Sequence, residues 1–292
     1  MRKTERAKNS FSHRRQEWIA SGTFGKITYP MKKICFKSVN KIFTPNLEFK
    51  DLLSLNIQKP SYVKALDNIS FDITEGSLIG VLGENGAGKT TLLKLLSGLL
   101  TPDSGEISIF EKNPLENSLE IKNRTGLLLN QDRSFYWRLT AKENINFFAN
   151  MYGLDKKTVQ KRLERLFEIL GINETIYKKR FDSLSSGMMK KFSIIRALLH
   201  NPDIVLLDEP TKNLDYESSK KFNAFARDYL VKKQGRIIFY VSHDISELEA
   251  ISDKIMILKK GKLLKFSNIS DLRAPNENSL ADIFMKMVAR HE

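Results

Sequence analysis

Apolar residues follow two different spacings along this chain. Short runs typical of strands occur at Ile34–Val39, Ile69–Ile73, Leu78–Leu82, Glu106–Phe110, Thr125–Leu129, Ile204–Leu207, Ile237–Val241 and Lys254–Leu258. Between them, apolar positions recur at helical spacing over about 89–98, 140–152, 156–170, 187–200 and 216–233. The runs 204–207 and 237–241 are wholly apolar and flank a helix, which is typical of buried parallel strands. We therefore predict an α/β fold with a doubly wound parallel sheet.

Two stretches depart from this alternation. Residues 140–200 carry three helix signals and no strand signal, which predicts a helical insert at about 132–200 within the α/β core. From Ser279 onward, apolar side chains recur at the spacing of one helix face; they are Leu280, Ile283, Phe284, Met287 and Val288. We expect an amphipathic C-terminal helix within 271–292, with its apolar face packed on the core or on a partner.

Composition narrows the class of protein. The chain has 292 residues, of which 41% are hydrophobic and 28% charged, so it is long enough for a substantial core. Its single cysteine, Cys35, excludes a disulfide framework and a Cys-rich zinc site. The apolar runs are far shorter than a bilayer requires, and the N-terminus lacks the apolar segment of a signal peptide. We expect a soluble, intracellular, globular protein.

Half of the positive charge lies at the N-terminus. The chain carries 48 Lys and Arg against 34 Asp and Glu, a net charge of +14. Residues 1–33 contribute +7 of this, with nine Lys and Arg against Glu5 and Glu17. Residues 1–32 are predicted to form a flexible basic arm, either a solvated tail or a contact to anionic lipid headgroups. No groove-reading motif or aromatic stacking platform follows, so we expect no nucleic-acid partner.

A phosphate-binding loop follows the strand Leu78–Leu82. Residues 83–90 match G-x-x-x-x-G-K-[ST] before a helix, and the predicted nucleotide-binding residues are Gly83, Glu84, Asn85, Gly86, Ala87, Gly88, Lys89, Thr90 and Thr91. Glycines let consecutive N–H groups point at phosphate oxygens, and the helix adds its positive end. Lys89 should reach the β- and γ-phosphates, and the Thr90 hydroxyl should bind Mg²⁺.

Two adjacent carboxylates end the apolar strand 204–207. Asp208 and Glu209 stand at the carboxyl end of this strand, where open α/β sheets bind their ligands. Like charges side by side are costly unless a cation or a substrate uses them. Asp208 is predicted to hold Mg²⁺, directly or through water, and Glu209 to act as the general base that polarises the attacking water.

The motifs together resemble an ATP-binding cassette (ABC) ATPase, and four further stretches resemble motifs of that family. Gln131 is similar to the glutamine that links the γ-phosphate and Mg²⁺ to the helical subdomain. Residues 184–188, Leu-Ser-Ser-Gly-Met, resemble the family signature L-S-G-G-Q, in which Ser185 and Gly187 would bind phosphate. His243 resembles the histidine that contacts the γ-phosphate, and residues 213–215 resemble the loop that links the two halves of the dimer.

This resemblance covers about residues 33–265 and implies a fold and a nucleotide. The fold is a P-loop (RecA-like) nucleotide-binding core with an antiparallel β subdomain and a helical insert that carries the signature, together the ATPase domain 33–270. The nucleotide is ATP. Ser186 and Met188 depart from the family's Gly and Gln, and Met188 removes one polar contact from the closed dimer. Phe43 is the first candidate for stacking on adenine and Tyr62 the second.

The resemblance also implies partners. In this family the signature of one subunit covers the ATP of the other, which implies a homodimer, or a heterodimer with a related cassette, held together through ATP. It further implies separate transmembrane permease subunits, with this chain peripheral on the cytoplasmic face of the cell (inner) membrane.

A narrower resemblance concerns the direction of transport. Residues 133–140, 143–145 and 147–148 are similar to the ABC-2 exporters, which move polysaccharides, teichoic acids, lipids or drugs. We expect an ATP-hydrolysing exporter subunit for a polysaccharide, lipid-linked glycan, lipid or drug. An importer subunit and a soluble, non-transport ATPase are the alternatives. Phe135, Tyr136 and Trp137 are predicted to dock a cytoplasmic helix of the membrane subunit, with core packing as the competing interpretation.

Overall fold

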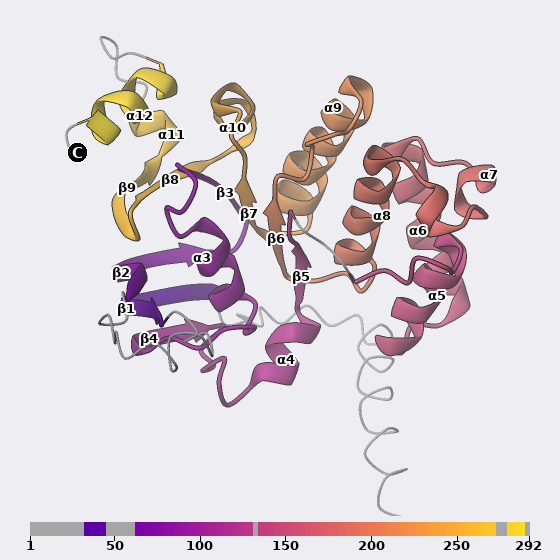
Figure 1. Cartoon of the computed structure of the whole chain (residues 1–292), viewed down its shortest axis with the longest axis horizontal. Helices are drawn as coiled ribbons and strands as arrows, with labels where there is room; N and C mark the ends of the chain where they lie inside the picture. Colours follow the sequence, from indigo (N-terminus) through magenta and orange to yellow (C-terminus); the bar gives the residue numbers. More distant parts are fainter. Residues whose placement is uncertain (1–31, 45–61, 131–133, 273–278, 290–292) are drawn as a thin grey trace, which may run out of the picture. The chain divides into compact units, whose positions relative to one another are not determined.

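The computed structural model describes residues 32–44, 62–130, 134–272 and 279–289 (Figure 1). Nearly all of the predicted basic arm therefore lies outside the described residues. The strands in this part of the chain are β1 (Lys33–Phe43), β2 (Val63–Thr74), β3 (Ser77–Gly83), β4 (Ser104–Ile109), β5 (Thr125–Leu128), β6 (Ile204–Asp208), β7 (Ile237–Val241), β8 (Lys254–Lys259) and β9 (Lys262–Asn268).

Helices connect these strands. Those in the described residues are α3 (Lys89–Leu96), α4 (Ser118–Asn123), α5 (Ala141–Met151), α6 (Lys156–Leu170), α7 (Glu174–Tyr177), the 3₁₀ turn η2 (Phe181–Ser183), α8 (Ser186–Leu198), α9 (Tyr216–Ala224), the π-helical η3 (Phe225–Lys233), α10 (Ile245–Ile251), α11 (Ile269–Leu272) and α12 (Leu280–Ala289). No helix among the described residues is long and apolar enough to span a membrane.

Two sheets organise the described part of the chain. The larger has the order β5-β6-β7-β3-β8-β9, and its strands are parallel except for β9, which pairs antiparallel with β8. The smaller is antiparallel, with the order β2-β1-β4. This architecture confirms the predicted α/β class with an antiparallel β subdomain.

The central strand β3 separates two hydrophobic cores. Its seven residues are all buried, and its side chains alternate between the sheet's two faces because a strand has a period of two. Leu78 and Leu82 belong to the core shared with the helical insert. Ile79 and Val81 belong to the core shared with the antiparallel sheet and α3. The strand is apolar throughout because both of its faces are covered.

Helices joined by short turns make up residues 141–198, which we term the helical insert. One isolated β-bridge, between Thr140 and Arg180, holds its start. Side chains fix the start of its helices. Thr140 and Glu143 form a capping box at α5, and Asp155 caps α6 by accepting from the Thr158 amide.

Some elements differ from the sequence-based expectation. The strand β9 gave no apolar signal, since lysines interrupt it and its side chains are only half-buried at an edge of the sheet. The sequence pattern also did not predict the short helices α4 and α10, because six or seven residues are too few to show a helical period. The predicted helix over 216–233 forms, but its second half is π-helical.

The C-terminal helix α12 packs against the core. Leu280 is buried, and Ile283, Phe284 and Met287 pack beside it against the same core as the helical insert. The side chain of Val288, the fifth residue of the predicted face, lies outside the described residues.

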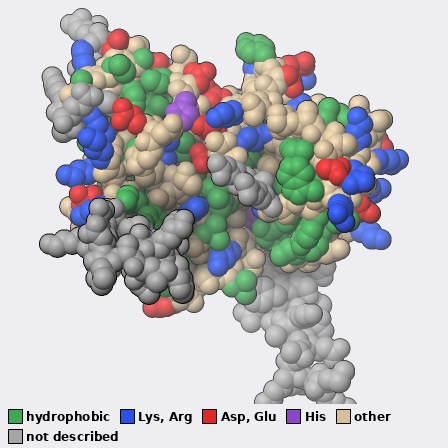
Figure 2. Space-filling view, viewed as in Figure 1, with side chains coloured by type: hydrophobic (Ala, Val, Ile, Leu, Met, Phe, Trp, Pro, Cys, Tyr) green, Lys and Arg blue, Asp and Glu red, His purple; other side chains and the backbone are tan. Residues whose placement is uncertain are grey.

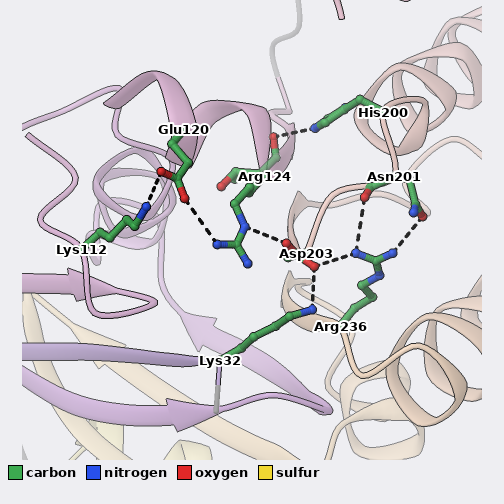
Figure 3. Close-up of polar contacts among 9 residues, drawn as sticks. Lys32, Lys112, Glu120, Arg124, His200, Asn201, Asp203 and Arg236 are labelled. Atoms are coloured by element: carbon green, nitrogen blue, oxygen red, sulfur yellow. Dashed lines mark hydrogen bonds and ion pairs between the residues drawn. The ribbon is translucent and has the colours of Figure 1, made fainter. Parts of the chain in front are cut away.

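One ion cluster joins the starts of three neighbouring strands (Figure 3). Asp203, just before β6, pairs with Arg124 Nε at 2.7 Å before β5 and with Arg236 Nη1 at 3.0 Å before β7. It also pairs with Lys32 Nζ at 2.7 Å, just before β1. Asp203 thus connects the parallel sheet to the antiparallel sheet, at the amino ends of the strands.

Candidate nucleotide-binding site

The phosphate-binding loop and the two carboxylates line one cavity of about 560 Å³. It lies at the carboxyl ends of β3 and β6, the usual ligand position in an open α/β sheet. The lining residues are Phe43, Val63, Ala65, Glu84, Asn85, Gly86, Ala87, Gly88, Lys89, Thr90, Thr91, Lys94, Leu129, Asn130, Asp208, Glu209 and His243. Segments far apart in the sequence therefore meet as the motifs predict.

The geometry of the loop explains why glycine occupies particular positions in it. Gly88 has φ +102°, and a Cβ there would lie 2.4 Å from the Ala65 carbonyl oxygen. Only glycine combines this left-handed backbone with so close an approach. Gly86 has φ +80°, but an added Cβ would meet no protein atom within 4 Å. The loop is therefore packed tightly against β2 at Gly88 and open at Gly86.

Lys89 is held inside the curl of the loop. Its Nζ donates to the Gly83 carbonyl at 2.5 Å and to the Glu84 carbonyl at 2.9 Å. Burial lowers the pKa of Lys89, and the nearby charges of Asp208 and Glu209 oppose that shift. An ammonium kept in place by backbone carbonyls is ready to pair with phosphate oxygens.

Two oxygen ligands suitable for Mg²⁺ lie together in this cavity. The Thr90 hydroxyl donates to Asp208 Oδ2 at 3.2 Å. Mg²⁺ prefers oxygen ligands and is usually held by one or two carboxylates together with substrate phosphates. The residues present therefore fit the metal that the phosphate-binding loop implies.

Glu209 and His243 meet directly. His243 Nε2 lies 2.8 Å from Glu209 Oε1, and Lys212 Nζ lies 2.8 Å from Glu209 Oε2. Glu209 has φ +50°, an uncommon conformation for a residue with a side chain. Its amide donates to the Val241 carbonyl at 2.9 Å, which fixes this turn against the end of β7.

The remaining predicted residues are Ser185, Gly187, Phe43, Tyr62 and Gln131, and of these only Phe43 is seen to line the cavity in the described part of the chain. Ser185 is exposed at the N-cap of α8, where its hydroxyl accepts from the Met188 amide at 3.3 Å. Neither Ser185 nor Gly187 lines the nucleotide cavity. Phe43 lines it, whereas Tyr62, 66% exposed, does not. Gln131 lies outside the described residues, directly after Asn130.

Sequence reasoning missed Lys212, which pairs with the predicted base. The hydrogen bond to Glu209 and its charge raise the pKa of Lys212. Its position three residues after Glu209 was the one available signal, because a tight turn after a strand brings such residues together. The side chain of Lys212 is half-exposed, whereas that of Glu209 is buried.

The aromatic run after Asn130 divides into core and surface. Phe135 is only 5% exposed and stacks on Phe181 with ring centroids 4.3 Å apart, so its predicted docking role is wrong. Tyr136 and Trp137 are 50% and 52% exposed. With Phe147, whose ring lies 5.0 Å from that of Tyr136, they form what we term the aromatic patch. Figure 2 shows hydrophobic side chains at the surface of this helical part, among lysines and arginines.

A buried asparagine fixes the backbone of this patch. The Asn144 side chain accepts from the Tyr136 amide at 2.8 Å and donates to the Tyr136 carbonyl at 3.0 Å. Asn144 is fully buried on α5. The exposed rings therefore stand on a rigid support, although nothing in the described residues covers them.

Comparison with known proteins agrees with this geometry. The family model described as ABC transporter matches residues 66–212. The ABC transporter ATP-binding protein NatA of Bacillus subtilis is 35% identical over 80% of this chain and 94% of its own length. The bacitracin transport ATP-binding protein BcrA of Bacillus licheniformis is 37% identical, covering 74% of this chain and 69% of its own. The glucose import ATP-binding protein GlcV of Saccharolobus solfataricus is 32% identical, covering 83% of this chain and 65% of its own length.

Solved structures share the fold. The ATP-binding cassette MJ0796, determined as a dimer bound to ADP and Pi, has a TM-score of 0.69 at 24% identity, covering 81% of this chain and 98% of that one. The chain therefore belongs to the ABC transporter family and is an ATP-binding subunit whose ATP hydrolysis is coupled to transport.

Proposed function

We propose that this chain is the ATPase subunit of an ABC-2 type exporter, which moves a polysaccharide, lipid-linked glycan, lipid or drug through a separate transmembrane subunit. The observation that carries the proposal is the closeness in sequence of the nucleotide cavity and the aromatic patch. Asn130 lines the cavity and Tyr136 begins the patch, six residues later. A relative named for bacitracin transport supports a drug as the cargo.

The proposed site residues divide the work of hydrolysis. The loop 83–91 binds the phosphates through its amides and Lys89, and Phe43 stacks on adenine. Thr90, Asp208 and Gln131 would hold Mg²⁺, which would neutralise charge on the phosphates. Glu209 takes a proton from the attacking water, and His243 holds the γ-phosphate and the Glu209 carboxylate in line.

One copy of the chain supplies only part of this site. Ser185 and Gly187 lie at the start of α8, away from the cavity of their own chain. We propose that they complete the site of a second cassette, so that two chains, identical or related, hold two ATP molecules between them. Met188 supplies no polar side chain at this contact, so the closed dimer should depend strongly on bound ATP.

The proposed place of the chain is peripheral, on the cytoplasmic face of the cell membrane. The aromatic patch would bind a cytoplasmic helix of the permease, because rigid exposed aromatics are frequent anchors of interfaces. The sugar-import relative GlcV favours an importer as the second candidate.

Substitution of Glu209 by Gln tests the nucleotide site. Glu209→Gln should bind ATP but hydrolyse it roughly 10²–10⁴-fold more slowly, and should elute as a dimer in gel filtration with Mg-ATP. The matched control is the double variant with Lys89→Ala, which should remain monomeric. A Glu209→Gln monomer that hydrolyses ATP at the parent rate would contradict the proposal.

The double variant Tyr136→Ala/Trp137→Ala tests the membrane partner. It should keep its melting temperature and ATPase activity but no longer co-purify with a multi-span protein from detergent-solubilised membranes. Once that partner is identified, proteoliposomes with the cassette outside distinguish the two directions. ATP added outside should drive cargo into the lumen for an exporter and out of it for an importer. A purely soluble companion would contradict both.

A further inference from the structure

Glu247, on α10, lies at the centre of a hydrogen-bond network that the proposed mechanism does not use. Its Oε1 accepts from the Thr211 hydroxyl and from the Asn223 amide, each at 2.8 Å. Its Oε2 accepts from the Ser242 hydroxyl at 2.7 Å. The hydroxyl of Tyr240, a fully buried residue, lies 2.9 Å from Oε1. One carboxylate thus gathers donors from the loop after β6, from α9, from β7 and from the loop after β7.

Two of these donors stand next to the residues proposed to react. Thr211 follows Glu209 by two positions, and Ser242 directly precedes His243. Glu209 and His243 are themselves in contact at 2.8 Å. Glu247 therefore joins, from behind, the two loops whose tips meet at that contact.

The chemistry of the network favours a rigid arrangement. Hydrogen bonds to a charged acceptor are shorter and stronger than those between neutral groups. Burial, together with the Glu247 charge, raises the pKa of Tyr240, so its hydroxyl stays protonated and available as a donor. With Glu209 and His243, Glu247 lines a second cavity of about 520 Å³, but it does not line the nucleotide cavity.

We propose that Glu247 is a positioning residue for ATP hydrolysis. It fixes the position of the loop after β6 relative to the loop after β7, so that Glu209 and His243 face the same ATP. This inference rests on the proposed roles of those two residues. Because Glu247 does not line the nucleotide cavity, its loss should leave ATP binding unchanged and slow the chemical step.

The test measures steady-state ATPase kinetics and melting temperature for the full chain. Glu247→Ala should lower kcat by roughly 10- to 100-fold, the usual consequence of a small misplacement of a reacting group. KM for ATP should stay within about twofold, since the phosphate-binding loop is intact. Glu247→Gln keeps one acceptor oxygen and should recover part of kcat. The matched control is Glu106→Ala, an exposed glutamate on β4 that pairs with Lys37, which should behave as the parent.

A milder variant, Thr211→Val, tests the same connection by itself if Glu247→Ala does not fold, and the double variant is measured where Glu247→Ala folds. Thr211→Val removes one hydroxyl without changing the side chain's shape and should lower kcat several-fold at constant KM. The double variant Thr211→Val/Glu247→Ala should be no slower than Glu247→Ala alone, because both changes break one connection. Additive losses would overturn the proposal.

Other outcomes separate this inference from the proposed function. A kcat of Glu247→Ala within about twofold of the parent, a KM that rises in step with the loss of kcat, or no recovery in Glu247→Gln would overturn the positioning role. Glu209→Gln is measured beside them. If Glu209→Gln hydrolyses ATP at the parent rate, the proposed base fails and this inference with it. If Glu209→Gln is inactive and Glu247→Ala is normal, the positioning role alone fails.

Discussion

Asp203→Asn should destabilise the fold without touching the nucleotide site. Asp203 is 20% exposed and pairs with Lys32, Arg124 and Arg236, whose side chains are 31%, 29% and 10% exposed (Figure 3). The amide keeps the shape of the carboxyl but removes the negative charge that Lys32, Arg124 and Arg236 share, and of these Arg124 still pairs with Glu120 at 3.7 Å. Removing one partner of a buried ion pair costs about 3–5 kcal/mol, and an exposed pair contributes about 0–1 kcal/mol.

The cluster lies between these limits, so we expect a loss of about 2–4 kcal/mol in the free energy of unfolding at pH 7. In a chain of this length that corresponds to a melting temperature about 4–10 °C lower. Thermal unfolding followed by circular dichroism measures it. The matched control is Asp228→Asn, which removes an exposed pair with Lys232 within one helical segment and should leave the melting temperature unchanged.

The stability lost in Asp203→Asn should depend on pH, and the pKa of Asp203 gives the direction of that dependence. Burial raises the pKa of Asp203, but the hydrogen bonds from Lys32 and Arg124 outweigh it, so the pKa in the folded protein is below its ordinary value. A carboxyl with a depressed pKa stabilises the fold above its unfolded pKa of about 3.9 and loses that contribution as pH falls. The difference between parent and Asp203→Asn should therefore shrink below about pH 4. An equal loss for Asp203→Asn and Asp228→Asn, or a difference independent of pH, would refute the reasoning.

Two further predictions concern the nucleotide site and the core. Lys89→Ala should abolish ATP binding or weaken it severely, because Lys89 is held inside the loop by the Gly83 and Glu84 carbonyls. Equilibrium binding of a fluorescent ATP analogue measures the affinity, and an unchanged affinity would exclude the assignment of the loop. Phe135→Ala should lower the free energy of unfolding by about 3–5 kcal/mol, since removal of a buried ring would leave a cavity. Chemical denaturation measures this free energy. A stability equal to that of Tyr136→Ala would contradict the division of the aromatic run into core and surface.

The sequence by itself determined the class of the fold and the identity of the phosphate-binding loop. These properties are local: a strand buried on both faces is apolar throughout, as in Leu78–Leu82 and Ile237–Val241. The glycines and Lys89 of the loop also form a contiguous pattern, because a curled loop must bind phosphate with neighbouring amides. The carboxylates Asp208 and Glu209 were predictable for the same reason, since their role depends on ending a strand.

Other properties depend on residues that meet only after folding. Phe135 and Tyr136 are adjacent aromatics with equal claims in the sequence, yet packing against Phe181 makes the first core and leaves the second exposed. The sequence could name Phe43 and Tyr62 as candidates, and only the tertiary structure places Phe43 on the cavity.

Polar contacts between distant parts of the fold could not be predicted from the sequence either. Asp203 pairs with Lys32, which is 171 residues away in the sequence. Glu247 meets Thr211 from a helix too short to show a period. Such contacts have no spacing rule, because the pairing of parallel strands, and not the distance along the chain, decides which strand ends become neighbours. For that reason the tertiary structure alone decided the connections behind the nucleotide site.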